Sequence, residues 1–271
     1  MATTITERTI GRVERVLWVR DPRAGLAAVV AVHSPRLGPA LAGCTVLPAA
    51  DSADAMLHAM RAAEWATLTA RTAGAPVGGA GVVVLGEADA DALDALGDLL
   101  GELAADLWLV PDLGMATAAA RRLGLRAGIL ADPHPALGAA GVVAATRAGW
   151  RQAGGGDLDG ARVHVTGAGG LCDEVAGRLA AAGARVARAH EGPVGAPGDA
   201  VVACPGAGLT EADAAALRCR LAVGAPGDAL DTEPVWAALA ARGVVAVPGS
   251  IAGGALLAAA ADLVTAAARG R

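Results

Sequence analysis

A glycine-rich turn is the part of the sequence best suited to hold a phosphate group. Residues 162–166 predict a buried strand, and the run Gly-Ala-Gly-Gly-Leu-Cys follows it at 167–172. The first glycine of such a run permits a tight turn, and the second lets backbone N–H groups approach a pyrophosphate at the start of a helix. We therefore expect a dinucleotide-binding turn with contacts from Gly167, Ala168, Gly169, Gly170 and Leu171.

The rest of this fingerprint is altered. Cys172 takes the place of the third glycine, which usually allows close packing of helix on strand, and its side chain is small enough for that purpose. About 20 residues further on, where an acid usually binds the ribose, the sequence has Arg188, His190 and Glu191. Glu191 would suit NAD, whereas Arg188 and His190 would suit the 2′-phosphate of NADP. Cys204 follows the next predicted strand and is a further expected contact. The alternative is a Rossmann-shaped domain with an empty or weakened site.

Two titratable side chains are candidates for acid–base chemistry. Asp112 follows the predicted strand 107–110, and open α/β sheets present ligand-binding groups at the carboxyl ends of their strands. His134 lies between two prolines in the loop that joins the two predicted domains. The alternative roles are a cap of the following helix for Asp112 and a solvent-facing loop position for His134.

Composition limits the chemistry further. All 22 Lys+Arg residues are arginines and there is no Tyr, so no mechanism of this polypeptide uses a lysine amine or a tyrosine phenol. The four cysteines are widely spaced without a C-x-x-C pair, which predicts buried free thiols and no metal site. The net charge is −5 and the arginines are scattered, which argues against nucleic acid as a partner. A small-molecule ligand is the better expectation.

The apolar segments do not suggest a membrane protein. No apolar run approaches the roughly 18 residues that cross a bilayer. The first residues also lack a basic segment followed by an apolar stretch. We expect a cytoplasmic protein without a membrane partner.

The elements that position these residues predict an α/β fold. In the first half, segments 16–20 and 26–33 predict a hairpin, and a helix is expected from Asp51 or Ser52 towards Arg71. A strand, a helix and a strand follow at 82–85, 88–106 and 107–110, which predicts a parallel pair of strands.

The alternation restarts at Arg162 in a doubly wound pattern. The predicted strands are 162–166, 184–189, 200–203, 221–223 and 244–247, and the predicted helices are 173–182, 211–219 and 234–241. We therefore expect an N-terminal α/β domain at 1–131 and a Rossmann-type, doubly wound domain at 132–271.

The order of motifs along nearly the whole chain resembles the Glu/Leu/Phe/Val amino-acid dehydrogenases, particularly the leucine and valine dehydrogenase branch. The matching segments are 31–43, 73–81, 110–114, 141–145 and the glycine turn. The resemblance implies an N-terminal domain for substrate binding and oligomerisation, a Rossmann domain for NAD(P), and hydride transfer between the substrate α-carbon and the nicotinamide. It also implies a catalytic acid at Asp112 and substrate contacts at Gly43, Thr69, Gly78 and Gly79.

The departures from the family pattern are as informative as the matches. The lysine that binds the substrate carboxylate in the family falls on Thr69, and the lysine that activates water falls on Gly81. Thr45 replaces an arginine, and the late run 250–254 lacks the family's asparagine. The resemblance further implies that the C-terminal helices, which in relatives reach back to the first domain, are mostly absent.

The chemistry that remains does not include ordinary oxidative deamination, because no lysine can activate water. Hydride addition to a preformed imine needs only a cofactor and a proton donor, for which Asp112 is available. We expect an NAD(P)-dependent reductase or related enzyme of amino-acid or secondary metabolism, acting on an imine, keto acid or other amino-acid-derived molecule. We also expect a homodimer formed through the N-terminal domain.

Two alternatives stay open. One is a catalytically silent binding subunit or sensor, which would associate with an active paralogue. The other is a non-redox cyclase or isomerase that uses Asp112.

Overall fold

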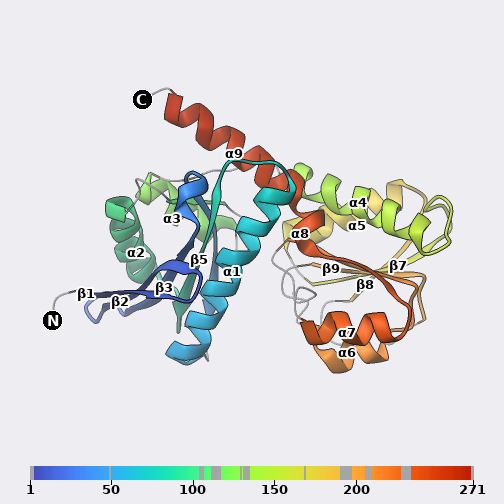
Figure 1. Cartoon of the computed structure of the whole chain (residues 1–271), viewed down its shortest axis with the longest axis horizontal. Coiled ribbons are helices and arrows are strands. Elements are labelled where there is room, and N and C mark those ends of the chain that lie inside the picture. The colour runs from blue at the N-terminus through green and yellow to red at the C-terminus, as the bar shows by residue number, and fades with distance from the viewer. Residues whose placement is uncertain are drawn as a thin grey trace. The chain divides into compact units, whose positions relative to one another are not determined.

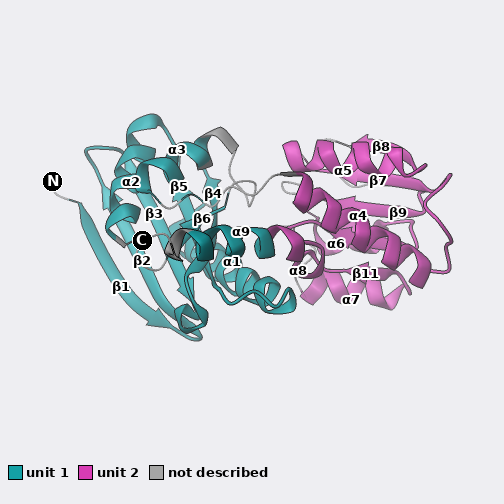
Figure 2. Ribbon diagram, turned by 90° about the horizontal axis from the view of Figure 1, so that it is seen from above, with its two compact units in different colours: residues 1–133, 257–271 teal, residues 134–256 magenta. Residues whose placement is uncertain are grey.

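The computed structural model describes residues 3–48, 50–103, 107–110, 117–128, 130, 135–167, 169–189, 197–204, 209–226 and 233–269. The described chain begins with consecutive strands and continues with a mixture of helices and strands (Figure 1). It divides into two compact units, residues 1–133 with 257–271 and residues 134–256 (Figure 2). The boundary predicted from the sequence placed residues 132–271 in the second domain, whereas residues 257–271 cluster with the first unit. Most of these residues belong to α9 (Gly254–Arg269), a helix of 16 residues.

The first unit is built on a mixed sheet. Its strands are β1 (Thr4–Ile10), β2 (Val13–Asp21), β3 (Leu26–His33), β4 (Ala40–Leu47), β5 (Gly78–Leu85) and β6 (Leu107–Leu109). Its helical segments are η1 (Pro35–Leu37), α1 (Ser52–Thr72), α2 (Ala90–Leu103) and α3 (Thr117–Ala127). In the described residues the strand order is β1-β2-β3-β5-β4-β6, antiparallel from β1 to β5 and parallel from β5 to β6.

The predicted hairpin is confirmed as β2 and β3, which pair in antiparallel register. Strands β5 and β6 run in the same direction, as predicted, but they do not pair with each other, because β4 lies between them and pairs with both. The sequence-based prediction missed β4, since its first five residues are Ala, Leu, Ala, Gly and Cys and its β-branched residues, Thr45 and Val46, come only near its end. It also missed β1 and α3.

Helix α1 covers one face of this sheet, and α2 and α3 cover the other (Figure 1). The predicted start of α1 is confirmed, because the Asp51 carboxylate accepts hydrogen bonds of 2.8 Å from the N–H groups of Ala53 and Asp54. Alanines form most of the buried face of α1: Ala55, Ala59, Ala63, Ala66 and Ala70. Such short side chains let the helix backbone approach the sheet closely.

The second unit contains a parallel sheet with helices on both faces. Its strands are β7 (Arg162–Thr166), β8 (Arg185–Ala189), β9 (Ala200–Ala203), β10 (Leu221–Gly224) and β11 (Val245–Val247). Its helices are α4 (Pro135–Gln152), α5 (Gly170–Ala181), α6 (Glu211–Ala216), α7 (Glu233–Ala241) and α8 (Gly249–Ala252). Residues of α4 and α5 pack on one face and residues of α6 and α7 on the other, which confirms the doubly wound prediction.

The order of these strands, β11-β10-β9-β7-β8, places a switch point between β7 and β9. The chain leaves β7 for β8 on one side and then returns to β9 on the other. Open α/β sheets bind ligands outside the carboxyl ends of the strands at such a point. The glycine turn follows β7 directly, so the fold places it at the expected binding position.

Candidate functional site

The glycine turn joins β7 to α5 with a backbone that only glycine adopts readily. Gly167 has a φ of 103° and Gly169 a φ of 94°, values that L side chains rarely take. Helix α5 begins at Gly170 and not at the predicted 173, because Gly169 is its N-cap. This N-cap supplies no side-chain acceptor, so the N–H groups of the first turn are available to an anion.

The space around the turn is open. Among the described residues, a Cβ atom on Gly169 or Gly170 would meet no other atom within 4 Å. Gly169 is therefore required by its positive φ and not by a crowded neighbourhood. An open approach to uncapped N–H groups is what a pyrophosphate needs.

The predicted contacts Leu171 and Cys204 lie beneath the turn. The side chain of Leu171 is 4% exposed and packs in the core, which leaves its backbone for a ligand. Cys204 is fully buried, and its N–H donates to the Thr166 carbonyl at 2.8 Å. Cys172 is also fully buried and fills the third-glycine position, as the small side chain predicted.

Arg188 lies at the edge of the same region, near the end of β8. Its Nη1 donates to Asp173 Oδ1 at 2.7 Å, which is in the first turn of α5. The side chain is 23% exposed, and its Nε is buried without a hydrogen-bond partner among the described residues. Arg188 therefore has an unused donor, but an entering phosphate would compete with Asp173. The sequence reading missed this aspartate, because a carboxylate in a first helical turn is common.

The remaining predicted residues of the reacting centre and cofactor site fall outside the described residues: Asp112, His134, Ala168, His190 and Glu191.

The predicted substrate residues of the first unit lie on β4, β5 and α1. Gly43 of β4 is the register partner of Gly81 on β5. Thr69 of α1 is fully buried, and its hydroxyl donates to the Trp65 carbonyl at 2.9 Å. The Thr69 hydroxyl is thus already hydrogen-bonded within α1.

The glycines of β5 are enclosed by their neighbours. A Cβ atom on Gly79 would overlap the Ala63 carbonyl oxygen and lie 2.7 Å from Thr67 Oγ1, both on α1. A Cβ on Gly78 would lie 2.7 Å from the Ser34 carbonyl oxygen. A glycine is needed here because another backbone occupies the space.

Gly81, at which the family resemblance implies a water-activating lysine, is enclosed in the same way. Its Cβ would overlap the Ala59 carbonyl oxygen and lie 2.9 Å from the Ala62 Cβ. Helix α1 therefore occupies the volume into which a side chain at this position would point.

A polar cluster at the end of β3 was not singled out from the sequence. His33 Nδ1 lies 3.0 Å from Thr67 Oγ1 and 3.3 Å from Ser34 Oγ. Ser34 has a left-handed backbone with φ 55°, which is uncommon for a residue other than glycine. The Thr67 hydroxyl also lies 3.1 Å from the Ala63 carbonyl, so the cluster fastens β3 to α1.

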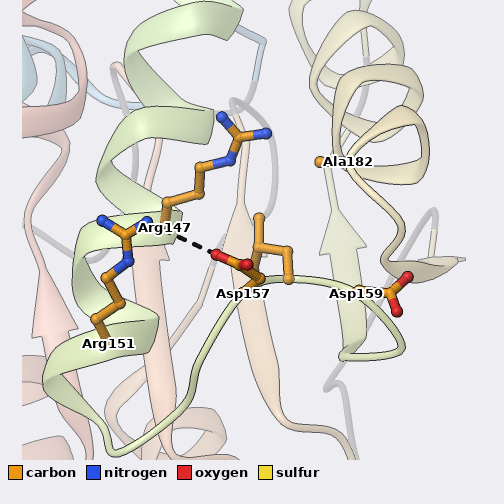
Figure 3. A pocket seen from close by; sticks show the side chains of 6 residues that line it. Arg147, Arg151, Asp157, Asp159 and Ala182 are labelled. Carbon is orange, nitrogen blue, oxygen red and sulfur yellow. Dashed lines mark ion pairs between the residues drawn. The ribbon is translucent and has the colours of Figure 1, made fainter.

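A surface hollow of about 380 Å³ lies in the second unit, away from the glycine turn (Figure 3). Its lining residues are Arg147, Arg151, Asp157, Leu158, Asp159 and Ala182. Arg151 and Asp157 form an exposed ion pair of 3.7 Å. The loop before β7 and the end of α5 contribute to it, so it lies at the amino end of the sheet, where this fold does not usually bind ligands.

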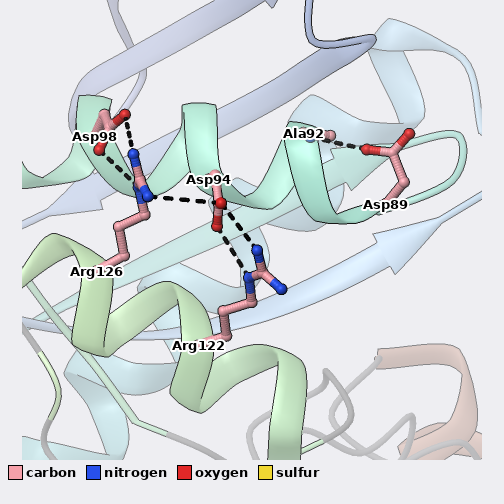
Figure 4. Close-up of polar contacts among 6 residues, drawn as sticks. All are labelled: Asp89, Ala92, Asp94, Asp98, Arg122 and Arg126. Atoms are coloured by element: carbon pink, nitrogen blue, oxygen red, sulfur yellow. Dashed lines mark hydrogen bonds and ion pairs between the residues drawn. The ribbon is translucent and has the colours of Figure 1, made fainter.

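A charged ladder joins α2 to α3 in the first unit (Figure 4). Arg122 pairs with Asp94 at 2.9 Å and Arg126 pairs with Asp98 at 2.7 Å. These carboxylates have a lowered pKa, first because each accepts hydrogen bonds from its arginine. All four side chains are largely or partly exposed, and exposed ion pairs contribute little free energy. We therefore assign the ladder a structural role in packing α3 against α2 and no role in chemistry.

Two further observations concern the described part of the chain. No group of three or more His, Cys, Asp or Glu residues there is placed to hold a metal ion. No helix there combines the length and the apolar character needed to cross a membrane.

No protein-family model matches the chain. Among curated proteins it is 31% identical over 105 residues to phenylalanine dehydrogenase of Caldalkalibacillus thermarum, covering 39% of this chain and 28% of that protein. It is 37% identical over 89 residues to leucine dehydrogenase of Bacillus cereus, covering 32% and 24%. It is 38% identical over 74 residues to valine dehydrogenase of Streptomyces ambofaciens, covering 27% of this chain and 70% of that sequence. The aligned region is thus a minor part of the phenylalanine and leucine enzymes.

Solved structures share the fold over most of the chain. The hetero-hexameric glutamate dehydrogenase of Thermus thermophilus, in its leucine-bound form, superposes with a TM-score of 0.72 at 19% identity, covering 99% of this chain and 76% of that one. The L-tryptophan dehydrogenase of Nostoc punctiforme gives a TM-score of 0.63 at 19% identity, covering 90% and 80%. With the sequence matches, this common two-domain α/β fold shows that the chain belongs to the amino-acid dehydrogenase family.

Proposed function

We propose that the protein is an NAD(P)-dependent reductase, or a related enzyme, that acts on an imine, keto acid or other amino-acid-derived small molecule. The observation that carries this proposal is the open glycine turn at the switch point of the second unit. The N–H groups at the start of α5 would bind the pyrophosphate, and Gly169 would let the cofactor approach the backbone. When bound, the nicotinamide supplies or accepts a hydride.

The first unit supports reduction more than deamination. Without lysine the chain has no amine to activate water, and α1 occupies the volume beside Gly81. A preformed imine or a carbonyl needs a proton but no activated water. We assign that proton to Asp112, with His134 as a second acid–base candidate.

The test begins with cofactor binding. Titration of the full chain with NADH and NADPH, followed by tryptophan fluorescence and calorimetry, should show micromolar binding. No binding at millimolar cofactor contradicts the reductase proposal. Where binding is found, oxidation of the reduced cofactor is followed with a panel of cyclic imines and keto acids. Asp112→Asn should then abolish turnover without changing cofactor affinity, and robust turnover of L-amino acids would overturn the argument from the missing lysines.

We further propose that NADP is favoured over NAD. Arg188 has a buried Nε without a partner in the described chain and lies beside the first turn of α5. Arg188→Ala should weaken NADPH binding and leave NADH binding unchanged. Asp173→Ala should instead strengthen NADPH binding, because it removes the competing carboxylate. Equal effects of either variant on both cofactors would contradict this assignment.

The enclosed glycines of β5 favour a second candidate, a catalytically silent subunit or sensor. This protein would bind a dinucleotide or an amino-acid-derived ligand and turn nothing over. A non-redox cyclase or isomerase would instead show turnover that depends on Asp112 and needs no dinucleotide. We also infer a cytoplasmic homodimer formed through the first unit. Light scattering of the purified chain, alone and with an active paralogue, distinguishes a homodimer from a mixed assembly.

A further inference from the structure

Two buried thiols lie together beneath the glycine turn. Cys172 is in the first turn of α5 and Cys204 follows β9, and both are fully buried in the same core cluster. They converge on one atom, the carbonyl oxygen of Thr166. Cys172 Sγ lies 3.7 Å from it, and the Cys204 N–H donates to it at 2.8 Å. The two thiols are also hydrogen-bonded to each other.

The surroundings of Cys172 favour its thiolate. The pKa of Cys172 is lowered, first by the hydrogen bond with Cys204 and then by the charge of Arg188, while burial and Asp173 oppose the shift. The start of α5 adds a favourable helix dipole. The isolated thiol of Cys44 is different, because burial raises its pKa to about 12. Cys172 is thus a better nucleophile than Cys44.

We propose that Cys172 and Cys204 are a redox modification site, at which a peroxide forms a reversible disulfide under the glycine turn. The pair needs no large movement of the chain, since both residues already contact the Thr166 carbonyl. The sequence gives no sign of the pair, because the cysteines are 32 positions apart (204 − 172) and lack a C-x-x-C spacing.

The chemistry balances with hydrogen peroxide as the oxidant. The Cys172 thiolate attacks one peroxide oxygen, the O–O bond breaks, and the other oxygen leaves as water after protonation. The Cys204 thiol then attacks the sulfur of the resulting sulfenic acid, the S–S bond forms, the S–O bond breaks, and a second water leaves. In total the two thiols lose two protons and two electrons to one peroxide, which is reduced to two water molecules. A dithiol reductant reverses the reaction by exchange.

The disulfide would tie the first turn of α5 to the end of β9. It would also remove the Cys172 S–H that reaches the Thr166 carbonyl, directly before Gly167. We therefore expect oxidation to weaken dinucleotide binding about tenfold, which corresponds to a strain of about 1.4 kcal/mol in the turn. This consequence rests on the proposed function, whereas disulfide formation itself does not.

Peptide mapping of the full chain tests the site. Reduced protein is treated with hydrogen peroxide, denatured, alkylated and digested. The expected product is a linked peptide pair containing Cys172 and Cys204, with Cys44 and Cys219 alkylated, and dithiothreitol should abolish the link. Cys204→Ser should remove it and Cys44→Ser should retain it. Absence of the link, or equal oxidation of Cys44, overturns the proposal.

Cofactor titration of the reduced and oxidised forms separates the two proposals. If peroxide treatment weakens dinucleotide binding by the wild type but not by Cys204→Ser, the result supports control of the glycine turn by the disulfide. Unchanged affinity in the oxidised form overturns that control. If neither form binds a dinucleotide and the linked peptide is present, the proposed function fails while the redox site stands.

Discussion

Two glycine-rich segments of this chain look alike in sequence and differ in structure. In β5, Gly79 and Gly81 are glycines because helix α1 lies against them and leaves no room for a Cβ atom. In the turn after β7, Gly169 is a glycine because its φ is positive, and the space beside it is open. The first segment is a packing contact, and the second is a surface that a ligand can reach.

The difference bears on the proposed function. The family resemblance places lysines at Gly81 and at the buried Thr69, both within the packed region of α1 and β5. The glycine turn depends on backbone geometry, and Gly167 and Gly169 have the positive φ that such a turn needs. The reductase that we propose would therefore bind a dinucleotide at this turn and work without those lysines.

The largest effect is expected from Gly81→Lys, which returns the family's lysine to β5. The new side chain must displace the Ala59 carbonyl and bury an ammonium, so the free energy of unfolding should fall by at least about 3 kcal/mol. No turnover of L-amino acids should appear. Urea unfolding measures the loss, and Gly177→Lys, at a helical glycine with nothing within 4 Å, is the matched control. A stable Gly81→Lys protein that deaminates amino acids would break the comparison.

The next effect concerns the turn itself. Gly169→Ala forces a residue with a Cβ into a φ of 94°, which costs about 1–3 kcal/mol of stability. Gly170→Ala adds a Cβ in equally open space, but at a helical position where alanine is favoured by up to about 1 kcal/mol. The melting temperatures of the two variants distinguish the cost of an unfavourable backbone conformation from the cost of a Cβ atom that has no room. Equal destabilisation by the two changes would show that the turn is packed and not open.

A smaller effect is expected at the opposite end of β7. The Asp199 carboxylate accepts the Arg162 N–H at 2.9 Å and lies 3.8 Å from Arg220. Its pKa is lowered, first by the backbone hydrogen bond from Arg162 and also by the Arg162 side chain, while burial opposes the shift. The folded state therefore gains stability above the ordinary pKa of aspartate and loses it as the pH falls through the lower folded value.

Asp199→Asn tests this directly. It should cost about 1 kcal/mol at neutral pH, and its difference from the wild type should shrink below about pH 4. Urea unfolding at several pH values gives both quantities. Asp157→Asn, at a side chain that is 89% exposed, serves as the control and should match the wild type throughout. A constant difference between Asp199→Asn and the wild type down to the lowest pH would mean that the carboxylate charge is unimportant.

The smallest effect is expected from Arg126→Ala in the charged ladder of α2 and α3. Its ion pairs with Asp94 and Asp98 are exposed and screened, so the melting temperature should change less than in Asp199→Asn. Added salt should reduce the difference further. A large fall in the melting temperature would mean that these ion pairs, as well as packing, stabilise the first unit.

Much of the fold follows from local patterns. Short apolar runs such as Ala200–Ala203 and Leu221–Val223 are fully or nearly buried strands, and the predicted strands of the second unit match the observed ones closely. The elements that were missed lack such patterns. Strand β1 is exposed along almost its whole length and β4 is rich in small residues, so neither presents a periodic apolar face.

The site divides in the same way. The glycine turn was found because its requirements, a strand, two glycines and a helix, are consecutive in sequence. The contacts of Arg188 with Asp173 and of Gly81 with Ala59 join residues on different elements. No local sequence pattern specifies these contacts. Only the folded chain shows that Arg188, a predicted cofactor contact, is already paired with Asp173, and that α1 fills the space beside Gly81.

The close packing of α1 on β5 also has a consequence for redesign of this chain. Any side chain at residue 81 would meet the Ala59 carbonyl oxygen and the Ala62 Cβ, so no single substitution there is accommodated without moving α1. A variant that carries an amine at this point of the sheet therefore needs changes in the helix as well as in the strand.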